Sequence, residues 1–315
     1  MILKQIFNKK QRFGARSATL VAMCCTFTFG ITACSTTDTT PDIVVTTNIL
    51  GDVVSQLVGD SADVQVLMKP NADPHSFGIS AQEAAAMENA DLIVANGLGL
   101  EEGLLANLDN ARSQGVEVIE VGELINPIEY SPGVKDPHFW TDPARMITAT
   151  EIIEAELIAN VDEAQATEIS QSASAYRTQL QELDREVSIL LNKVASQNRT
   201  LVTNHHVFGY LAARFDYSVI ATIIPGGSTL AAPSAADLAD ISTAITENRV
   251  PAIFTDSSSP QKLADVLASN AGIKVQVVPL YTESLTAADG EAGDYLSMQK
   301  INAQRISDAL TQAHL

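Results

Sequence analysis

The sequence contains very little cysteine. Of three cysteines in 315 residues, Cys24 and Cys25 lie inside an N-terminal apolar segment, and only Cys34 follows it. If that segment is removed, the single remaining cysteine excludes an intramolecular disulfide framework and a thiolate-rich metal site. No other stretch is long and apolar enough to predict a helix that spans a bilayer.

Basic and aromatic residues are also scarce. Lys and Arg number 19 against 38 Asp and Glu, and five of the bases precede Cys34 while no acid does. The chain after Cys34 therefore has a formal net charge of about −24, and such a surface repels phosphate backbones, which argues against nucleic-acid binding. Trp140 is the only tryptophan, so a cleft lined by aromatic side chains for a small organic ligand is not expected.

The N-terminus has the pattern of an export signal. A basic stretch ending at Arg16 leads into the apolar run SATLVAMCCTFTFGITAC, whose last four residues, ITAC at 31–34, resemble a bacterial lipobox. The cysteine of a lipobox receives lipid. We therefore expect a lipoprotein signal peptide at 1–33, a flexible tether at 34–42, and an extracytoplasmic protein anchored to the cell membrane through lipid on Cys34.

Short apolar runs alternate with helical patterns along the rest of the chain. One series of strands is predicted from DIVVTTN to VEVIEVG and a second from RTLVTN to KVQVVPL. Between them, residues 144–196 contain no glycine and predict one or two long helices. This order predicts an α/β fold of two parallel-sheet lobes with helices on both faces, at 43–163 and 198–315, joined by a long rigid linker helix at 164–197.

Candidate binding residues fall where the predicted strands end. In open parallel sheets, ligands bind beyond the carboxyl ends of the strands. Four of the five histidines and two carboxylates lie at strand exits or in loops: His75, His138, His205, His206, Asp256 and Glu283. Their placement alone leaves open whether they bind a metal ion or support the fold.

The tripeptide Asp-Pro-His occurs twice, at 73–75 and at 136–138. Proline fixes its own φ and biases the preceding Asp toward an extended conformation, which stiffens the approach to the histidine. A histidine that binds a metal ion needs an oriented ring, and a nearby Asp can accept its second ring N–H. The repeated tripeptide is therefore a candidate device for holding two ligand histidines.

Several segments together resemble one known family. NADPHSF, ADLIVANGLGLEEGL, DPHFWTDP, TNHHVFGYLAARF, VPAIFTDSSSP and LYTESL are similar to segments of the zinc/manganese-binding lipoproteins of metal ABC transporters, the cluster A-I solute-binding proteins. The resemblance runs in order from about 43 to 313, and DPHFWTDP is its most specific part. It implies two α/β lobes, joined by a rigid long helix, that clasp one divalent metal ion between them.

Residue by residue, the resemblance implies four metal ligands: His75, His138, His205 and Glu283. His206 stands where the family commonly has Asp, and Asp256 is a competing carboxylate, so both remain alternative ligands or supports of the ligands. Two further departures concern the first loop, which has Gly78-Ile79 in place of the usual Glu-Pro, and the fourth ligand, where Glu283 replaces the usual Asp.

Three imidazoles and one carboxylate suit Zn²⁺ in a four-coordinate site, and nitrogen-rich sites favour Zn²⁺ over Mn²⁺. Manganese-selective members of the family tend to carry a carboxylate where this chain has His205. Zinc-binding members often have a His-rich loop between the first two ligands, and this chain has none. Zn²⁺ is therefore the predicted metal, with Mn²⁺ as the alternative.

The predicted role is high-affinity capture of metal outside the membrane and delivery to an ABC permease and its ATPase subunit, by a monomer that is not an enzyme. The chain has no Walker-type loop, as expected of the binding component. The rival hypotheses are a manganese-specific binding protein of the same family and a secreted zinc-dependent hydrolase. A hydrolase would need an open coordination position and a general base, and no His-Glu-x-x-His segment is present.

Overall fold

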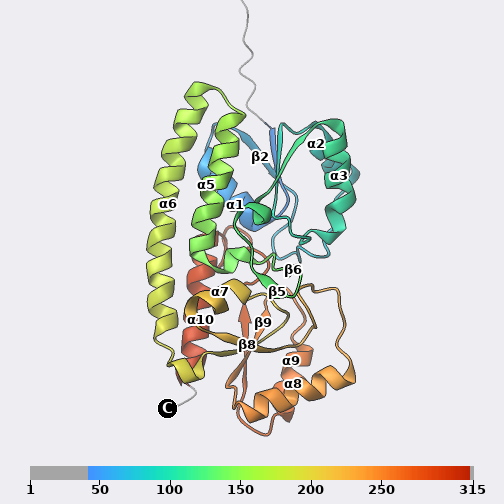
Figure 1. Ribbon diagram of the computed structural model, residues 1–315, viewed down its shortest axis with the longest axis vertical. Coiled ribbons are helices and arrows are strands. Elements are labelled where there is room, and N and C mark those ends of the chain that lie inside the picture. The colour runs from blue at the N-terminus through green and yellow to red at the C-terminus, as the bar shows by residue number, and fades with distance from the viewer. Residues whose placement is uncertain (1–41, 313–315) are drawn as a thin grey trace, which may run out of the picture. The chain divides into compact units, whose positions relative to one another are not determined.

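The computed structural model describes residues 42–312, and Figure 1 shows how their helices and strands are arranged. The predicted signal peptide at 1–33 and the lipidation site Cys34 lie outside the described residues, as does the predicted tether apart from Asp42. Asp42 is already the first residue of a strand. Among the described residues, no helix is long and apolar enough to cross a membrane.

Four parallel strands form the first sheet, in the order β2-β1-β3-β4. Its strands are β1 (Asp42–Val45), β2 (Asp63–Val66), β3 (Leu92–Ala95) and β4 (Glu117–Glu120). Its helices are α1 (Asn48–Val58), α2 (Ala81–Asn89), the 3₁₀ turn η1 (Glu102–Leu104), α3 (Leu105–Gln114) and α4 (Val121–Leu124). Each parallel pair therefore needs a crossover connection, which the helices supply.

The central strand β1 is buried on both faces. Ile43 and Val45 belong to the core that contains the apolar side chains of α1, whereas Val44 packs with Met87 of α2 and Leu108 of α3. Successive side chains of a strand point to opposite faces, so a strand that is apolar at consecutive positions requires a cover on each side. The helices of the first sheet provide both covers.

The second sheet has the same construction, in the order β10-β9-β7-β8, with all pairs parallel. Its strands are β7 (Thr200–Thr203), β8 (Ser218–Thr222), β9 (Ala252–Asp256) and β10 (Gln276–Leu280). Its helices are the 3₁₀ turn η3 (Ser196–Asn198), α7 (Gly209–Phe215), α8 (Ala235–Glu247), α9 (Lys262–Asn270) and α10 (Tyr295–Gln312). The prediction of an α/β fold with two parallel sheets is confirmed.

Helices also cover both faces of this sheet. Val202 and Ile253 pack in one core with apolar residues of α8 and α9. Their strand neighbours Leu201 and Phe254 belong to the other core, which includes residues of α7 and α10. The alternation in β7 and β9 thus repeats that of β1.

Two long helices occupy the glycine-free region. They are α5 (Pro143–Ala159) and α6 (Glu163–Asn192), which pack against each other, and α6 also runs along α10 (Figure 1). Asp162 caps α6 by accepting the backbone N–H groups of its first turn, which separates the two helices. The linker expected at 164–197 falls largely on α6, and the proposed lobe boundaries remain a prediction.

A small antiparallel hairpin lies ahead of α5 and was not predicted. It pairs β5 (Glu129–Ser131) with β6 (Val134–Lys135), and the 3₁₀ turn η2 (Phe139–Thr141) follows. Gly133 has a φ of +77° between the two strands, a conformation that glycine adopts without steric cost. The hairpin leads directly into the second Asp-Pro-His tripeptide.

Packing of α6 gives a testable expectation. Leu191 is fully buried in the core, whereas Ile189 on the same helix is 63% exposed. Leu191→Ala should lower the free energy of unfolding by about 2–5 kcal/mol, because it removes buried methyl groups and leaves a cavity. The control Ile189→Ala should change it by less than about 0.5 kcal/mol. Urea denaturation measures both, and equal losses would contradict this placement of α6.

Candidate metal centre

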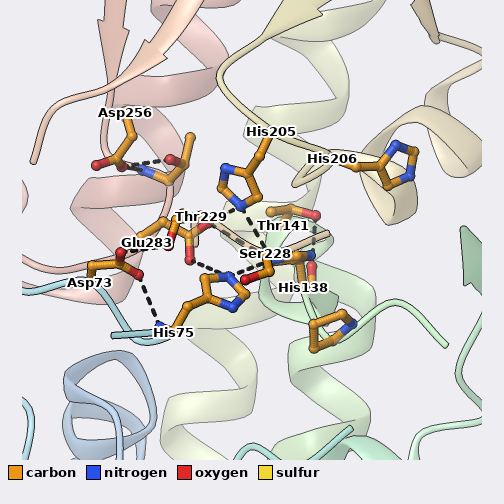
Figure 2. A network of polar contacts seen from close by, with 12 residues as sticks. Asp73, His75, His138, Thr141, His205, His206, Ser228, Thr229, Asp256 and Glu283 are labelled. Carbon is orange, nitrogen blue, oxygen red and sulfur yellow. Dashed lines mark hydrogen bonds and ion pairs between the residues drawn. The ribbon is translucent and has the colours of Figure 1, made fainter. Parts of the chain in front are cut away.

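Four side chains from separate segments meet in the protein interior: His75, His138, His205 and Glu283. Each offers one ligand atom that lies within 4.8 Å of the other three. None of the four residues is more than 2% exposed. Figure 2 shows the three imidazole rings and the carboxylate gathered together. These are the four residues that the family resemblance implied as ligands.

Each of these residues lies in a loop that follows a strand. His75 lies between β2 and α2, and His138 lies between β6 and η2. His205 comes two residues after the end of β7, and Glu283 comes three residues after the end of β10. Both sheets therefore contribute to the cluster from loops that leave their strands, where parallel sheets place ligand sites.

The donor atoms have spacings suited to one small metal ion. His138 Nε2 lies 3.4 Å from Nε2 of both His75 and His205. Glu283 Oε1 lies 3.0 Å from His205 Nε2 and 4.0 Å from His138 Nε2. Glu283 Oε2 lies 3.7 Å from His75 Nε2. Four tetrahedral donors about 2.0–2.1 Å from Zn²⁺ would be about 3.3 Å apart, a value within the observed range.

Both Asp-Pro-His tripeptides form the same local turn. Asp73 Oδ1 accepts the backbone N–H of His75 at 2.9 Å, and Asp136 Oδ1 accepts that of His138 at 3.0 Å. An Asp side chain bonded to the backbone two residues further on forms an Asx-turn. The intervening proline removes further backbone freedom. The repeated tripeptide thus fixes the backbone of two histidines of the cluster.

Asp136 also orients the ring of its histidine. Its Oδ1 lies 2.7 Å from His138 Nδ1, so Nδ1 carries the hydrogen and Nε2 presents a lone pair to the cluster. Tyr210 Oη donates to the Asp136 carbonyl at 2.8 Å and holds the same loop. Burial raises the pKa of Asp136 to about 6, an effect that the backbone N–H of His138 opposes.

Within residues 42–312, the ring of His75 has no comparable hydrogen bond to an acidic residue. Its Nδ1 is buried without a hydrogen-bond partner among the described residues and lies 3.7 Å from Glu102 Oε1. Glu102 Oε1 accepts from Ser228 Oγ at 2.6 Å, and Thr229 Oγ1 donates to Asp73 Oδ2 at 2.6 Å. The loop after β8 therefore contacts both acidic residues beside His75. Sequence reasoning missed these contacts, because no local pattern links this loop to residues so far away in the chain.

Glu283 is buried among three imidazoles without a hydrogen bond to either oxygen in the described part of the chain. The nearest polar atom is His205 Nε2, 3.0 Å from Glu283 Oε1. Burying a carboxylate removes its hydration, which is costly unless donors or a positive charge replace the water. A cation bound at this position would compensate the negative charge of Glu283.

The pKa shifts describe the same site. Burial lowers the pKa of His75, and it lowers that of His138 well below the usual value, although the charge of Glu283 opposes both shifts. Burial also acts to lower the pKa of His205, but Glu283 outweighs it and the pKa is raised. Burial acts to raise the pKa of Glu283, but the three histidines, His205 foremost, lower it. Glu283 therefore stays anionic, His75 and His138 stay neutral with lone pairs to offer, and the protonated form of His205 is favoured by the carboxylate beside it.

The two alternative residues lie outside the cluster. His206 points away from it in Figure 2, and its ring packs beside Tyr130 with centroids 5.4 Å apart. Asp256, at the end of β9, accepts hydrogen bonds from the backbone N–H and the hydroxyl of Thr282 at 3.2 and 2.6 Å. Asp256 therefore contacts the residue before Glu283 and does not join the four-residue group.

Fold and cluster together define a class, an α/β protein whose buried nitrogen and oxygen donors can hold one metal ion. The family described as "Zinc-uptake complex component A periplasmic" matches residues 43–309. The chain belongs to this family, which confirms the resemblance found in the sequence.

Individual relatives agree with this assignment. The zinc-binding lipoprotein AdcA of Streptococcus pneumoniae (strain R6) is 30% identical over 315 residues, which cover 94% of this chain and 61% of AdcA. The manganese ABC transporter substrate-binding lipoprotein PsaA of Streptococcus pneumoniae is 26% identical, with 94% and 99% covered. The chain thus spans 61% of the length of AdcA but nearly all of PsaA.

A solved structure supports the fold in the same way. The periplasmic zinc-binding protein TroA of Treponema pallidum superposes with a TM-score of 0.81 at 28% identity, over 86% of this chain and 99% of TroA. Two parallel sheets surrounded by helices are therefore shared with a metal-binding protein of known structure.

Gly209 offers a test of the Asp136 contact. A Cβ at Gly209 would lie 2.1 Å from Asp136 Oδ2, whereas one at Gly78 would have no atom within 4 Å. Gly209→Ala should therefore displace Asp136, disorient His138 and weaken binding of Zn²⁺ by about 10- to 100-fold, the usual effect of losing a ligand's hydrogen-bond partner. Competition with a zinc-binding dye measures the affinity. Equal affinities in Gly209→Ala and the control Gly78→Ala would contradict the role of Asp136.

Proposed function

We propose that this protein captures a divalent transition metal, Zn²⁺ above all, outside the membrane and delivers it to an ABC-type metal permease. The proposed ligands are His75, His138, His205 and Glu283, and the metal ion is cargo. The observation that carries the proposal is the buried Glu283 carboxylate, which faces three imidazoles and accepts no hydrogen bond from the described residues.

The preference for Zn²⁺ follows from the donor set. Three imidazole nitrogens and one carboxylate oxygen at near-tetrahedral spacing suit Zn²⁺, whereas Mn²⁺ favours oxygen donors in an octahedral arrangement. Burial of all four residues leaves little access for the water molecules that would complete such a shell. AdcA and TroA, two relatives named as zinc-binding, support the same choice, and the manganese-binding PsaA keeps Mn²⁺ as the alternative.

A binding role is favoured over catalysis by the number of donors. A catalytic zinc site keeps three protein ligands and an open position for water. Here four protein donors would fill a tetrahedral shell, so no position is left for a nucleophilic water. The protein would therefore hold the metal ion and release it, without being an enzyme.

The proposed location and partners follow from the N-terminus and the relatives. AdcA and PsaA are both named lipoproteins, which supports cleavage after residue 33 and a lipid anchor on Cys34. We propose a monomer tethered to the outer side of the cell membrane, with the two lobes and the linker bounded as the sequence predicts. Its partners would be the permease and the ATPase subunit, which are separate chains.

Metal binding can be tested on the protein purified without a histidine tag. One Zn²⁺ per chain should bind and stabilise the folded state by about 2.7 kcal/mol at a free concentration 100 times the Kd, with reversal by a chelator. His138→Ala should abolish tight binding and this thermal shift, because it removes a donor. His206→Ala is the matched control and should lose far less of both, since its ring lies outside the cluster and approaches only Asp136 Oδ2, at 3.9 Å. Calorimetric titration and thermal melts give the two readouts.

Three results would count against the proposal. Loss of binding in His206→Ala with retention in His205→Ala would show that the ligand assignment is wrong. Tighter retention of Mn²⁺ than of Zn²⁺ would overturn the choice of metal. Absence of any stoichiometric divalent metal would contradict the function itself.

A further inference from the structure

Trp140 links the two loops that carry His138 and Glu283. Its ring lies edge-on to the ring of His138, with centroids 5.2 Å apart. Its Nε1 donates a hydrogen bond of 2.8 Å to the carbonyl of Thr282, the residue before Glu283. Trp140 is only 2% exposed. One buried side chain therefore supports a proposed ligand in the loop before η2 and the backbone of another after β10.

Trp140 is itself fixed from the opposite side. Its carbonyl oxygen accepts hydrogen bonds from Tyr295 Oη and Gln299 Nε2, at 2.7 and 2.9 Å. Both donors belong to α10, the C-terminal helix packed along α6. The backbone of Trp140 is therefore tied to α10, which also packs against β10 and β9 of the second sheet.

Thr282 is held from a second direction by Asp256. Asp256 Oδ2 accepts the backbone N–H and the hydroxyl of Thr282, and Oδ1 accepts the backbone N–H of Ser258 at 2.8 Å. All three hydrogen-bonding groups of Thr282 are therefore occupied, its carbonyl by Trp140 and its two donors by Asp256. We name Trp140, Thr282 and Asp256 the Thr282 clamp.

The segment after Glu283 is also restrained. Asn48 Oδ1 accepts the backbone N–H of Leu285 at 3.0 Å, and Asn48 Nδ2 donates to Ser284 Oγ at 2.7 Å. Asn48 begins α1, beside the first sheet. Glu283 thus lies between two restrained backbone positions, which set the point from which its buried side chain extends.

The reach of Glu283, meaning how far its carboxylate extends into the cluster, decides whether one or both of its oxygens can bind a metal ion. Oε1 lies near His205, and Oε2 lies 3.7 Å from His75, so both oxygens border the cluster. A small shift of the backbone would let both oxygens bind and would raise the coordination number. Mn²⁺ tolerates that change, whereas Zn²⁺ in a four-coordinate site loses its preferred geometry.

We propose that the Thr282 clamp sets the reach of Glu283 and thereby the preference for Zn²⁺ over Mn²⁺. The three residues are positioning residues, since none of their side chains belongs to the four-residue cluster. This inference rests on the proposed function. It also gives a role to the tryptophan of DPHFWTDP and to Asp256, which the proposed ligand set does not use.

Two variants test the clamp with the full protein. Trp140→Phe keeps a ring beside His138 but removes the donor to Thr282, and Thr282→Val removes the hydroxyl that Asp256 accepts. Each should lower the affinity for Zn²⁺ by about 10- to 100-fold and that for Mn²⁺ by a smaller factor, so that the zinc-to-manganese affinity ratio falls. The visible absorption of bound Co²⁺, which is stronger in tetrahedral than in octahedral sites, should weaken in both.

Two further variants serve as controls. Thr282→Ser keeps the hydroxyl and should retain the wild-type affinity ratio and Co²⁺ spectrum. Tyr217→Phe removes a buried hydroxyl that donates to the Leu191 carbonyl at 2.8 Å, and neither residue belongs to the cluster or the Thr282 clamp. It should lower the stability without changing the affinity ratio, which separates positioning from a general loss of stability.

The outcomes separate a failure of the clamp proposal from a failure of the proposed function. If the wild-type protein binds Zn²⁺ and both test variants keep its affinity ratio and Co²⁺ spectrum, the clamp is overturned and the proposed function stands. If Thr282→Ser loses as much as Thr282→Val, the bond to Asp256 is not responsible and the clamp is likewise overturned. If the wild-type protein binds neither metal, the proposed function fails and the clamp fails with it.

Discussion

The structure of the site depends on one constraint, a carboxylate buried among three imidazoles. Glu283 is 1% exposed, and burial disfavours the protonated forms of the three imidazoles nearest to it. Only at His205 does the charge of Glu283 outweigh burial and raise the pKa. In such surroundings, an uncompensated negative charge costs several kcal/mol. A divalent cation satisfies the carboxylate and the imidazole lone pairs together. The arrangement could therefore hold a metal ion, as we propose.

The fold brings this site together from loops that leave the two parallel sheets and the β5-β6 hairpin. Loops after β2 and β6 supply two histidines in identical Asx-turns, and loops after β7 and β10 supply the third histidine and the carboxylate. Bonds between these segments, such as that from Trp140 to Thr282, keep the donors at fixed separations. Rigid support of this kind lowers the ordering cost of binding and defines the coordination geometry.

The α/β fold and the candidate site residues could be predicted from the sequence because the patterns that indicate them are local. Alternating strands and helices, and histidines just beyond strands, are visible within short windows of the chain. The choice of Glu283 over Asp256 needed the family resemblance, since both carboxylates lie at or just beyond the end of a strand. The bonds from Ser228 to Glu102 and from Trp140 to Thr282 join residues 126 and 142 positions apart, so no local pattern could reveal them. The hairpin of β5 and β6 was missed because its strands have only three and two residues.

X-ray absorption at the zinc edge of the zinc-loaded protein tests the central claim most directly. Three imidazole nitrogens and one carboxylate oxygen should surround the ion at about 2.0–2.1 Å, with no further ligand. Those distances would show that the buried cluster, with Glu283 as its charge, is the metal site. A shell of five or six ligands dominated by oxygen, or one with fewer than three imidazoles, would contradict the account.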